Sequence, residues 1–202
     1  MITLKKFTIV DIIIEGRADF SQKVWFDYCA TTLITNSDGK YILCDPGSNR
    51  ELLIQKLHER KIHVNTIDFV FITHSHLDHS LLAGIFPSAI IVTGSQWWKN
   101  GTEIHTHDGS YFGKDIQIIK TSGHSSSDSY LIINAHERKV CIAGDLFWWD
   151  INDIQETTTI EIINHADRFA IDPLLLKKAR TQILNTANFI IPGHGNPFYT
   201  NI

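Results

Sequence analysis

The stretch Thr73-His74-Ser75-His76-Leu77-Asp78-His79 decides how this chain of 202 residues is interpreted. It begins at the end of an apolar run at residues 68–73, which predicts a buried strand. Alternate side chains of an extended segment project to the same side, so His74, His76 and Asp78 would face one way. A turn that starts at Asp78 would bring His79 to an adjoining position. The spacing therefore predicts a metal site at a strand's end, with a loop that two ions can share.

Three further side chains of ligand type stand alone, each directly after a glycine and at the end of an apolar strand. They are His124 after Gly123, Asp145 after Gly144, and His194 after Gly193. Glycine has no Cβ, so the backbone can turn sharply there and approach a bound ion closely. The repeated pattern indicates that these three side chains join the histidine-rich loop in one pocket.

The remaining hydrophobic pattern predicts short strands and three helices. Strands are expected at residues 7–15, 31–35, 40–44, 68–73, 89–92, 116–120, 130–133, 139–143 and 188–191, and helices at 50–61, 157–169 and 173–187. Asp172 is the expected N-cap of the last helix, with Pro173 at its first position. Tight turns between neighbouring strands favour a layered α+β sandwich over a doubly wound parallel sheet. We find no linker, so residues 1–202 are expected to form one domain.

The composition excludes several classes of protein. With 43% hydrophobic and 20% charged residues, the chain is neither disordered nor fibrous, and no apolar stretch reaches the roughly 18 residues of a membrane span. A formal charge of −4 provides no general field that would attract nucleic acid. Cys29, Cys44 and Cys141 are too few for a disulfide framework and are expected in the core. These features predict a cytoplasmic protein with a small-molecule substrate and no membrane partner.

In this order and spacing, the ligand-type residues resemble those of the metallo-β-lactamase superfamily, from about residue 10 to the C-terminus. The resemblance implies a four-layer αβ/βα sandwich with the metal site at one edge. It implies two ligand groups joined by a bridging residue: His74, His76 and His124 on the first ion, Asp78, His79 and His194 on the second, and Asp145 between them. The segments at 78–87, 143–147 and 191–198 are most similar to the compact group named metallo-β-lactamase domain-containing protein 1.

Two aspartates refine this resemblance: Asp45 agrees with it, and Asp145 departs from the best-known members of the superfamily. Asp45, in an Asp-Pro-Gly turn, looks like the early aspartate loop of the superfamily. Its carboxylate either supports the ligand loop from behind or only closes a turn, and both interpretations are open. Asp145 stands where the best-known β-lactamases have cysteine, so antibiotic hydrolysis is not the expected activity.

A pair of divalent ions can hold a hydroxide and polarise the oxygen of an ester, thioester or phosphodiester. We therefore expect a dinuclear metal-dependent hydrolase of small esters or thioesters, with Asp78 as the candidate acid/base residue. Zinc suits imidazole and carboxylate ligands, and iron and manganese also accept them. The alternatives are cleavage of RNA or single-stranded DNA, a sulfur dioxygenase-like reaction at one iron held by His74, His76, His124 and Asp145, and a non-catalytic binding module.

The chain has two pairs of neighbouring tryptophans, and we interpret the two pairs differently. Trp148 and Trp149 follow Asp145 closely, so at least one is a candidate for lining the substrate cleft, the alternative being packing. Trp97 and Trp98 are expected in the core.

The other polar clusters have plainer interpretations. A second His-x-His, at His105 and His107, lies before a glycine and predicts an exposed hairpin. His165 and Asp167 are expected on the solvated face of the helix at 157–169. The wet face of the last helix is expected to carry three cations: Lys177, Lys178 and Arg180.

Overall fold

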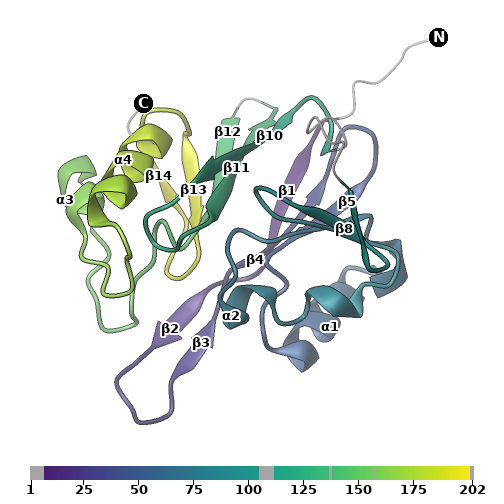
Figure 1. Cartoon of the computed structure of the whole chain (residues 1–202), viewed down its shortest axis with the longest axis horizontal. Helices are drawn as coiled ribbons and strands as arrows, with labels where there is room; N and C mark the ends of the chain where they lie inside the picture. Colours follow the sequence, from purple (N-terminus) through teal and green to yellow (C-terminus); the bar gives the residue numbers. More distant parts are fainter. Residues whose placement is uncertain (1–6, 105–111, 137, 157, 201–202) are drawn as a thin grey trace.

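Two β-sheets face each other in the computed structural model, and helices cover the outer face of each sheet (Figure 1). The structure describes residues 7–104, 112–136, 138–156 and 158–200. The exposed hairpin predicted at His105 and His107 lies outside the described residues.

The larger sheet has seven strands in the order β1-β4-β5-β6-β7-β8-β9. These strands are β1 (Ile9–Ile14), β4 (Thr31–Thr35), β5 (Tyr41–Cys44), β6 (Phe69–Phe71), β7 (Ile90–Val92), β8 (Trp97–Lys99) and β9 (Thr102–Ile104). The tight turn expected between the strands at 31–35 and 40–44 is confirmed, since β4 and β5 pair antiparallel with Thr35 opposite Tyr41. β5, β6 and β7 run parallel, so their carboxyl ends meet at one edge of the sheet.

The smaller sheet has five strands in the order β10-β11-β12-β13-β14. These strands are β10 (Ile116–Thr121), β11 (Asp128–Ala135), β12 (Arg138–Gly144), β13 (Phe189–Pro192) and β14 (Phe198–Tyr199). β12 and β13 run parallel, so the residues that follow them, Asp145 and His194, leave the sheet at the same edge.

The described residues form α1 (Arg50–Glu59), α2 (Leu77–Ser80), α3 (Thr159–Asn164) and α4 (Pro173–Leu184), with 3₁₀ turns at Val64–Thr66 and Ala83–Ile85. α4 begins as predicted, because the Asp172 carboxylate accepts hydrogen bonds from the N–H groups of Leu174 and Leu175. A separate hairpin of β2 (Arg17–Asp19) and β3 (Phe26–Tyr28) projects beyond the sheets, near α2 (Figure 1). None of the described helices is long and apolar enough to span a membrane.

Alternation along the strands produces the layers. In β5, Ile42 and Cys44 face the core between the sheets, whereas Leu43 packs toward α1. In β12, Ile142 belongs to the same central core, whereas Cys141 packs toward α4. Side chains of a strand alternate between its faces, so each sheet buries both surfaces. The four-layer αβ/βα sandwich is thereby confirmed.

The sequence pattern fails in two places. The helix predicted at residues 157–169 is wrong in length, because α3 ends at Asn164 and the chain is irregular as far as Asp167. The pattern also misses β2, β3, β8, β9 and β14, which have two or three residues each. Such strands are too short to show a period of two.

Candidate metal centre

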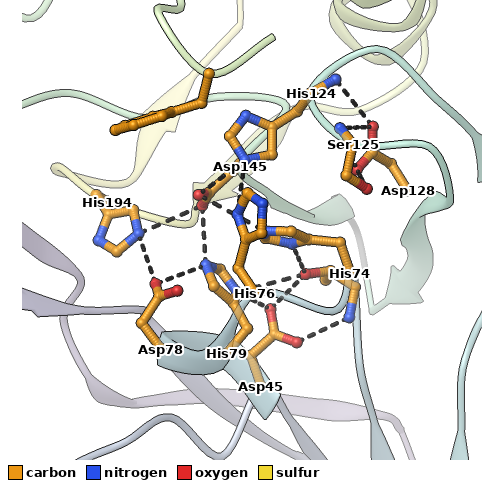
Figure 2. A network of polar contacts seen from close by, with 12 residues as sticks. Asp45, His74, His76, Asp78, His79, His124, Ser125, Asp128, Asp145 and His194 are labelled. Atoms are coloured by element: carbon orange, nitrogen blue, oxygen red, sulfur yellow. Dashed lines mark hydrogen bonds and ion pairs between the residues drawn. The ribbon is translucent and has the colours of Figure 1, made fainter. Parts of the chain in front are cut away.

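The seven predicted ligand residues come together at one edge of the sandwich (Figure 2). Four of them belong to the loop after β6 and to α2: His74, His76, Asp78 and His79. Three come from the ends of strands in the smaller sheet: His124 after β10, Asp145 after β12 and His194 after β13. The centre therefore lies where the two sheets meet.

The first ligand group contains three histidines and one carboxylate, His74, His76, His124 and Asp145. His124 Nε2 lies 3.2 Å from His76 Nδ1 and 3.4 Å from Asp145 Oδ2. His74 Nε2 lies 3.8 Å from Asp145 Oδ2. Each of the four residues offers one ligand atom, and these four atoms all lie within 4.8 Å of one another. A single cation could contact all four at this spacing.

The second ligand group contains Asp78, His79, Asp145 and His194. His79 Nε2 lies 3.2 Å from Asp78 Oδ2 and 3.0 Å from Asp145 Oδ1. His194 Nε2 lies 3.3 Å from Asp78 Oδ2 and 3.4 Å from Asp145 Oδ1. Asp145 thus turns one carboxylate oxygen to each group, which is the geometry of a bridging residue.

Of the buried atoms that make no hydrogen bond within the described part of the chain, four face the two ligand groups. They are His74 Nε2, Asp78 Oδ2, His79 Nε2 and Asp145 Oδ1. Buried polar atoms are normally paired, because an unpaired one loses its hydration without compensation. All four point into the two ligand groups, so cations bound there would satisfy them. The residues present therefore fit a pair of metal ions.

Protons and cations compete for the same nitrogen atoms. Burial alone would lower the pKa of His194, but the neighbouring carboxylates of Asp145 and Asp78 raise it to about 10. The pKa of His79 is likewise raised well above its ordinary value, against the effect of burial, by Asp145 and Asp45. A carboxylate-rich centre that attracts protons so strongly attracts divalent cations for the same electrostatic reason.

Asp45 supports the ligand loop from behind. Its Oδ1 accepts a hydrogen bond from the Thr73 N–H at 2.8 Å, and its Oδ2 accepts one from Thr73 Oγ1 at 2.7 Å. Its Oδ2 also lies 2.9 Å from His79 Nδ1 and so orients that imidazole. Of the two interpretations left open by the sequence, these contacts favour the supporting role.

Asp167 supports His124 in the same way, and the sequence analysis missed it. His124 Nδ1 lies 2.8 Å from Asp167 Oδ2, and both side chains are 1% exposed. The prediction of a solvated helical position for Asp167 is wrong, because the chain leaves the helix before this residue. Nothing in the local pattern signals a contact that joins residues 43 positions apart.

Arg180 fixes the segment that delivers Asp167. Its guanidinium donates to the carbonyl of His165 at 2.6 Å and to that of Leu146 at 2.6 Å, and the side chain is buried. The prediction that Arg180 lies on the wet face of α4 is therefore wrong, whereas Lys177 and Lys178 are exposed as expected.

Glycine is required at two positions beside the centre. A Cβ on Gly193 would lie 1.8 Å from Asp145 Oδ1, and a Cβ on Gly144, whose φ is +53°, would lie 2.5 Å from Thr73 Oγ1. Both contacts are far below van der Waals distance, so a side chain at either position would displace the ligands. The predicted close approach of the backbone is confirmed at these two glycines.

The two candidate cleft tryptophans point to different places. Trp148 lines a cavity of about 490 Å³ together with His76, Asp78 and His194. Trp149 does not line this cavity: its indole N–H donates to Glu156 at 2.6 Å, and its ring packs in the core under the helices. Trp148 therefore lies at the cavity beside the ligand groups and Trp149 does not, and the role of Trp148 in a substrate cleft stays a prediction.

Trp97 and Trp98 also differ in their burial. Trp97 is buried in the central core, as expected, whereas Trp98 is 37% exposed. The cysteines agree with the prediction, since Cys29, Cys44 and Cys141 are buried and free.

The family model and the related sequences that match this chain point to the same family. A family model described as the metallo-beta-lactamase superfamily matches residues 24–95. Metallo-beta-lactamase domain-containing protein 1 of Xenopus laevis is 30% identical over 201 residues, covering 94% of this chain and 80% of the relative. The Caenorhabditis elegans protein C03F11.2 is 30% identical over 182 residues, covering 84% of this chain and 48% of the relative. The chain thus spans about half the length of the nematode relative.

Solved structures show the same fold at low identity. A Thermotoga maritima structure described within the metallo-beta-lactamases has a TM-score of 0.69 at 16% identity, covering 96% of this chain and 99% of that one. The dizinc quorum-quenching lactonase AidC has a TM-score of 0.61 at 14% identity, with coverages of 88% and 77%. A chemotaxis sensor named ODP, solved as a peroxy diiron species, has a TM-score of 0.63 at 13% identity, with coverages of 96% and 86%.

Proposed function

The chain belongs to the metallo-beta-lactamase superfamily, and on that premise we propose that it is a hydrolase that binds two divalent ions and cleaves a small ester or thioester. The observation that carries the proposal is the pair of ligand groups that share Asp145. A complete second group favours two ions over the single iron of a dioxygenase-like reaction. A pair of ions would lower the pKa of a bound water and polarise the oxygen of the substrate.

The residues of the chain would hold the ions and shape the site around them. His74, His76 and His124 would hold the first ion, Asp78, His79 and His194 the second, and Asp145 both. Asp78 also lines the cavity, which supports the proposal that its carboxylate accepts a proton during the reaction. Asp45 and Asp167 would keep two of the imidazoles in one orientation.

Zinc is the ion that we propose, because imidazole and carboxylate ligands suit it. AidC, with its two zinc ions, supports this choice, whereas the diiron sensor shows that a protein of the same fold can hold iron. Manganese is the remaining candidate.

The test combines metal content with turnover. The purified protein, stripped with chelator and reloaded with zinc, iron or manganese, is analysed for ions per chain and assayed with aryl thioesters, aryl esters and bis-aryl phosphate. We expect about two ions per chain and metal-dependent turnover of an ester or thioester. Less than one ion per chain with every metal would contradict the metal site. Turnover of the phosphodiester alone would replace the proposed activity with that of a nuclease, and uptake of two ions without turnover of any substrate would favour a binding module.

A further inference from the structure

The cavity beside the second ligand group has an apolar wall. Of its lining, four residues are ligands and one is Asp27, and the rest are apolar side chains: Phe20, Trp25, Leu77, Trp148 and Phe169. Its volume of about 490 Å³ lies in the range of small-molecule sites, which are mostly apolar with a few polar groups. We call it the aromatic cavity.

The aromatic wall is assembled from three separate segments that pack on one another. Phe20 and Trp25 come from the β2–β3 hairpin, Trp148 follows β12, and Phe169 follows α3. The Phe20 ring lies edge-on to the other three, with centroid distances of 5.0 Å to Trp25, 5.9 Å to Trp148 and 5.6 Å to Phe169. Such contacts are typical of a packed aromatic cluster, so the wall has a defined shape.

No lysine or arginine lines the aromatic cavity, as far as the described residues show. The nearest arginine of the wall, Arg168, lies over the Phe20 ring at 4.5 Å, contacts the Asp150 carboxylate at 3.5 Å and lines a neighbouring cavity. An ionised carboxylate or phosphate among the aromatic rings, away from the ligand groups, would therefore lose its hydration without a lysine or arginine to pair with.

Asp27 is the remaining polar residue of the lining. Its carboxylate lines the aromatic cavity, is 30% exposed and lies 3.4 Å from His194 Nδ1, yet it is not part of either ligand group. An aspartate cannot carry a positive charge, so Asp27 offers no counter-charge to an anionic group of a substrate.

We propose that the aromatic cavity binds an uncharged ester or thioester by an aromatic or branched apolar group, and that it rejects the same molecule when that group carries a carboxylate or phosphate. This inference rests on the proposed function and names its class of substrate. The reaction adds water across the C–O or C–S bond, giving a carboxylic acid and an alcohol or thiol.

The test uses substrates that differ only in the group that would enter the cavity. kcat/KM of the zinc-loaded protein is measured with ethyl acetate, with ethyl phenylacetate and benzyl acetate, which carry a ring on either side of the ester, and with the para-carboxy derivatives of the latter two. We expect about tenfold or higher kcat/KM for one of the neutral ring substrates over ethyl acetate, and about a tenfold loss on adding the carboxylate. Equal kcat/KM for all substrates would overturn the inference and leave the proposed function intact.

Variants assign the preference to the cavity. Trp25→Ala and Phe169→Ala are expected to lower the ratio of kcat/KM for the neutral ring substrate to kcat/KM for ethyl acetate toward one. Trp98→Ala is the matched control, since Trp98 is a half-exposed tryptophan on β8, outside the cavity lining. A preference that Trp25→Ala and Phe169→Ala leave unchanged would show that the ring binds elsewhere.

A binding measurement covers the case in which no ester is turned over and the proposed function fails. Saturation-transfer NMR compares the zinc-loaded protein's affinity for phenylacetone, a neutral ketone that keeps the phenylacetyl group of ethyl phenylacetate, with that for 4-carboxyphenylacetone. We expect about tenfold weaker binding of the anion, and weaker binding of the neutral ketone to Trp25→Ala. Equal affinities for the two ketones would overturn the inference whatever the enzyme activity.

Discussion

The two ligand groups share Asp145 but differ in their exposure. In the first group His76 is exposed, whereas His79 and His194 of the second group are 0% and 2% exposed. An ion in the second group would therefore be enclosed by protein on more sides than an ion in the first. The comparison teaches that two sites with similar donor atoms can differ in how readily they exchange their ion with solvent.

The groups also differ in how their imidazoles are held. Asp45, which orients His79, comes from the loop after β5 and is bonded to Thr73 beside the ligands. Asp167, which orients His124, comes from an irregular segment far along the chain and depends on Arg180 for its position. Each group thus has its own support, and the two supports can be weakened separately.

Removing the shared ligand breaks both groups at once and has the largest expected effect. Asp145→Asn keeps the shape of the side chain but removes the charge that both ions would contact. We expect loss of both ions and a fall in activity of about a thousandfold or more, because neither ion could then activate water. Metal analysis and kcat measure the effect, and circular dichroism checks that the variant is folded. Two ions per chain in this variant would refute the bridging role.

Removing one histidine from each group tests the difference in exposure. His76→Ala and His79→Ala are each expected to leave about one ion per chain, held by the other group. Because His79 is enclosed and lies against Asp45, we expect its loss to lower the melting temperature more than the loss of the exposed His76. Metal content and thermal unfolding are measured in parallel. Equal melting temperatures for His76→Ala and His79→Ala would contradict the proposed difference in how the two ligand groups are enclosed.

Weakening one support at a time gives a smaller effect. Asp167→Asn and Asp45→Asn are each expected to lower the affinity for one ion by about 10- to 100-fold, because an imidazole that loses its orienting carboxylate is a poorer ligand. Competition with a coloured chelator measures the two affinities. Asp115→Asn, remote from the ligand groups, serves as the control. If both variants weakened the same ion, the supports would not be independent.

Proton release is the smallest expected signal. The pKa of His194 is raised to about 10, so this imidazole carries a proton at pH 7–9, and a cation that binds Nε2 has to displace it. The apparent metal affinity is therefore expected to rise with pH up to about 10, and to fall as the solution is acidified. Calorimetry of zinc binding in buffers of different ionisation enthalpy counts the protons released. A count of zero at pH 8 would contradict the prediction.

The sequence predicts the ligands better than their supports, for a physical reason. His74, His76, Asp78 and His79 lie within six positions, so the geometry of one strand end places them together whatever the rest of the chain does. The glycines before Asp145 and His194 mark close backbone approaches, which can also be read locally. Asp167 reaches His124 only because the last turns of a predicted helix are not formed.

The aromatic cavity could not be foreseen for a similar reason. Trp25 and Phe20 belong to a hairpin whose strands have three residues each, too few for a periodic signal. Phe169 reaches the cavity only because the chain leaves the helix at Asn164. Arg180 was misplaced because its amphipathic position suggested solvent, whereas three carbonyl groups accept its hydrogen bonds. Burial of an arginine is decided by such tertiary acceptors, which the helical period does not reveal.

The division of the ligands between the two sheets has a mechanical consequence. Four ligands follow a strand of the larger sheet and three follow strands of the smaller one, and each ligand group contains residues of both kinds. An ion in either group would therefore be bound to both halves of the sandwich. Such an ion would act as a cross-link between the sheets, as a disulfide does elsewhere, and would resist their separation during unfolding. In this fold, loading with metal would prolong the lifetime of the protein as well as equip it for chemistry.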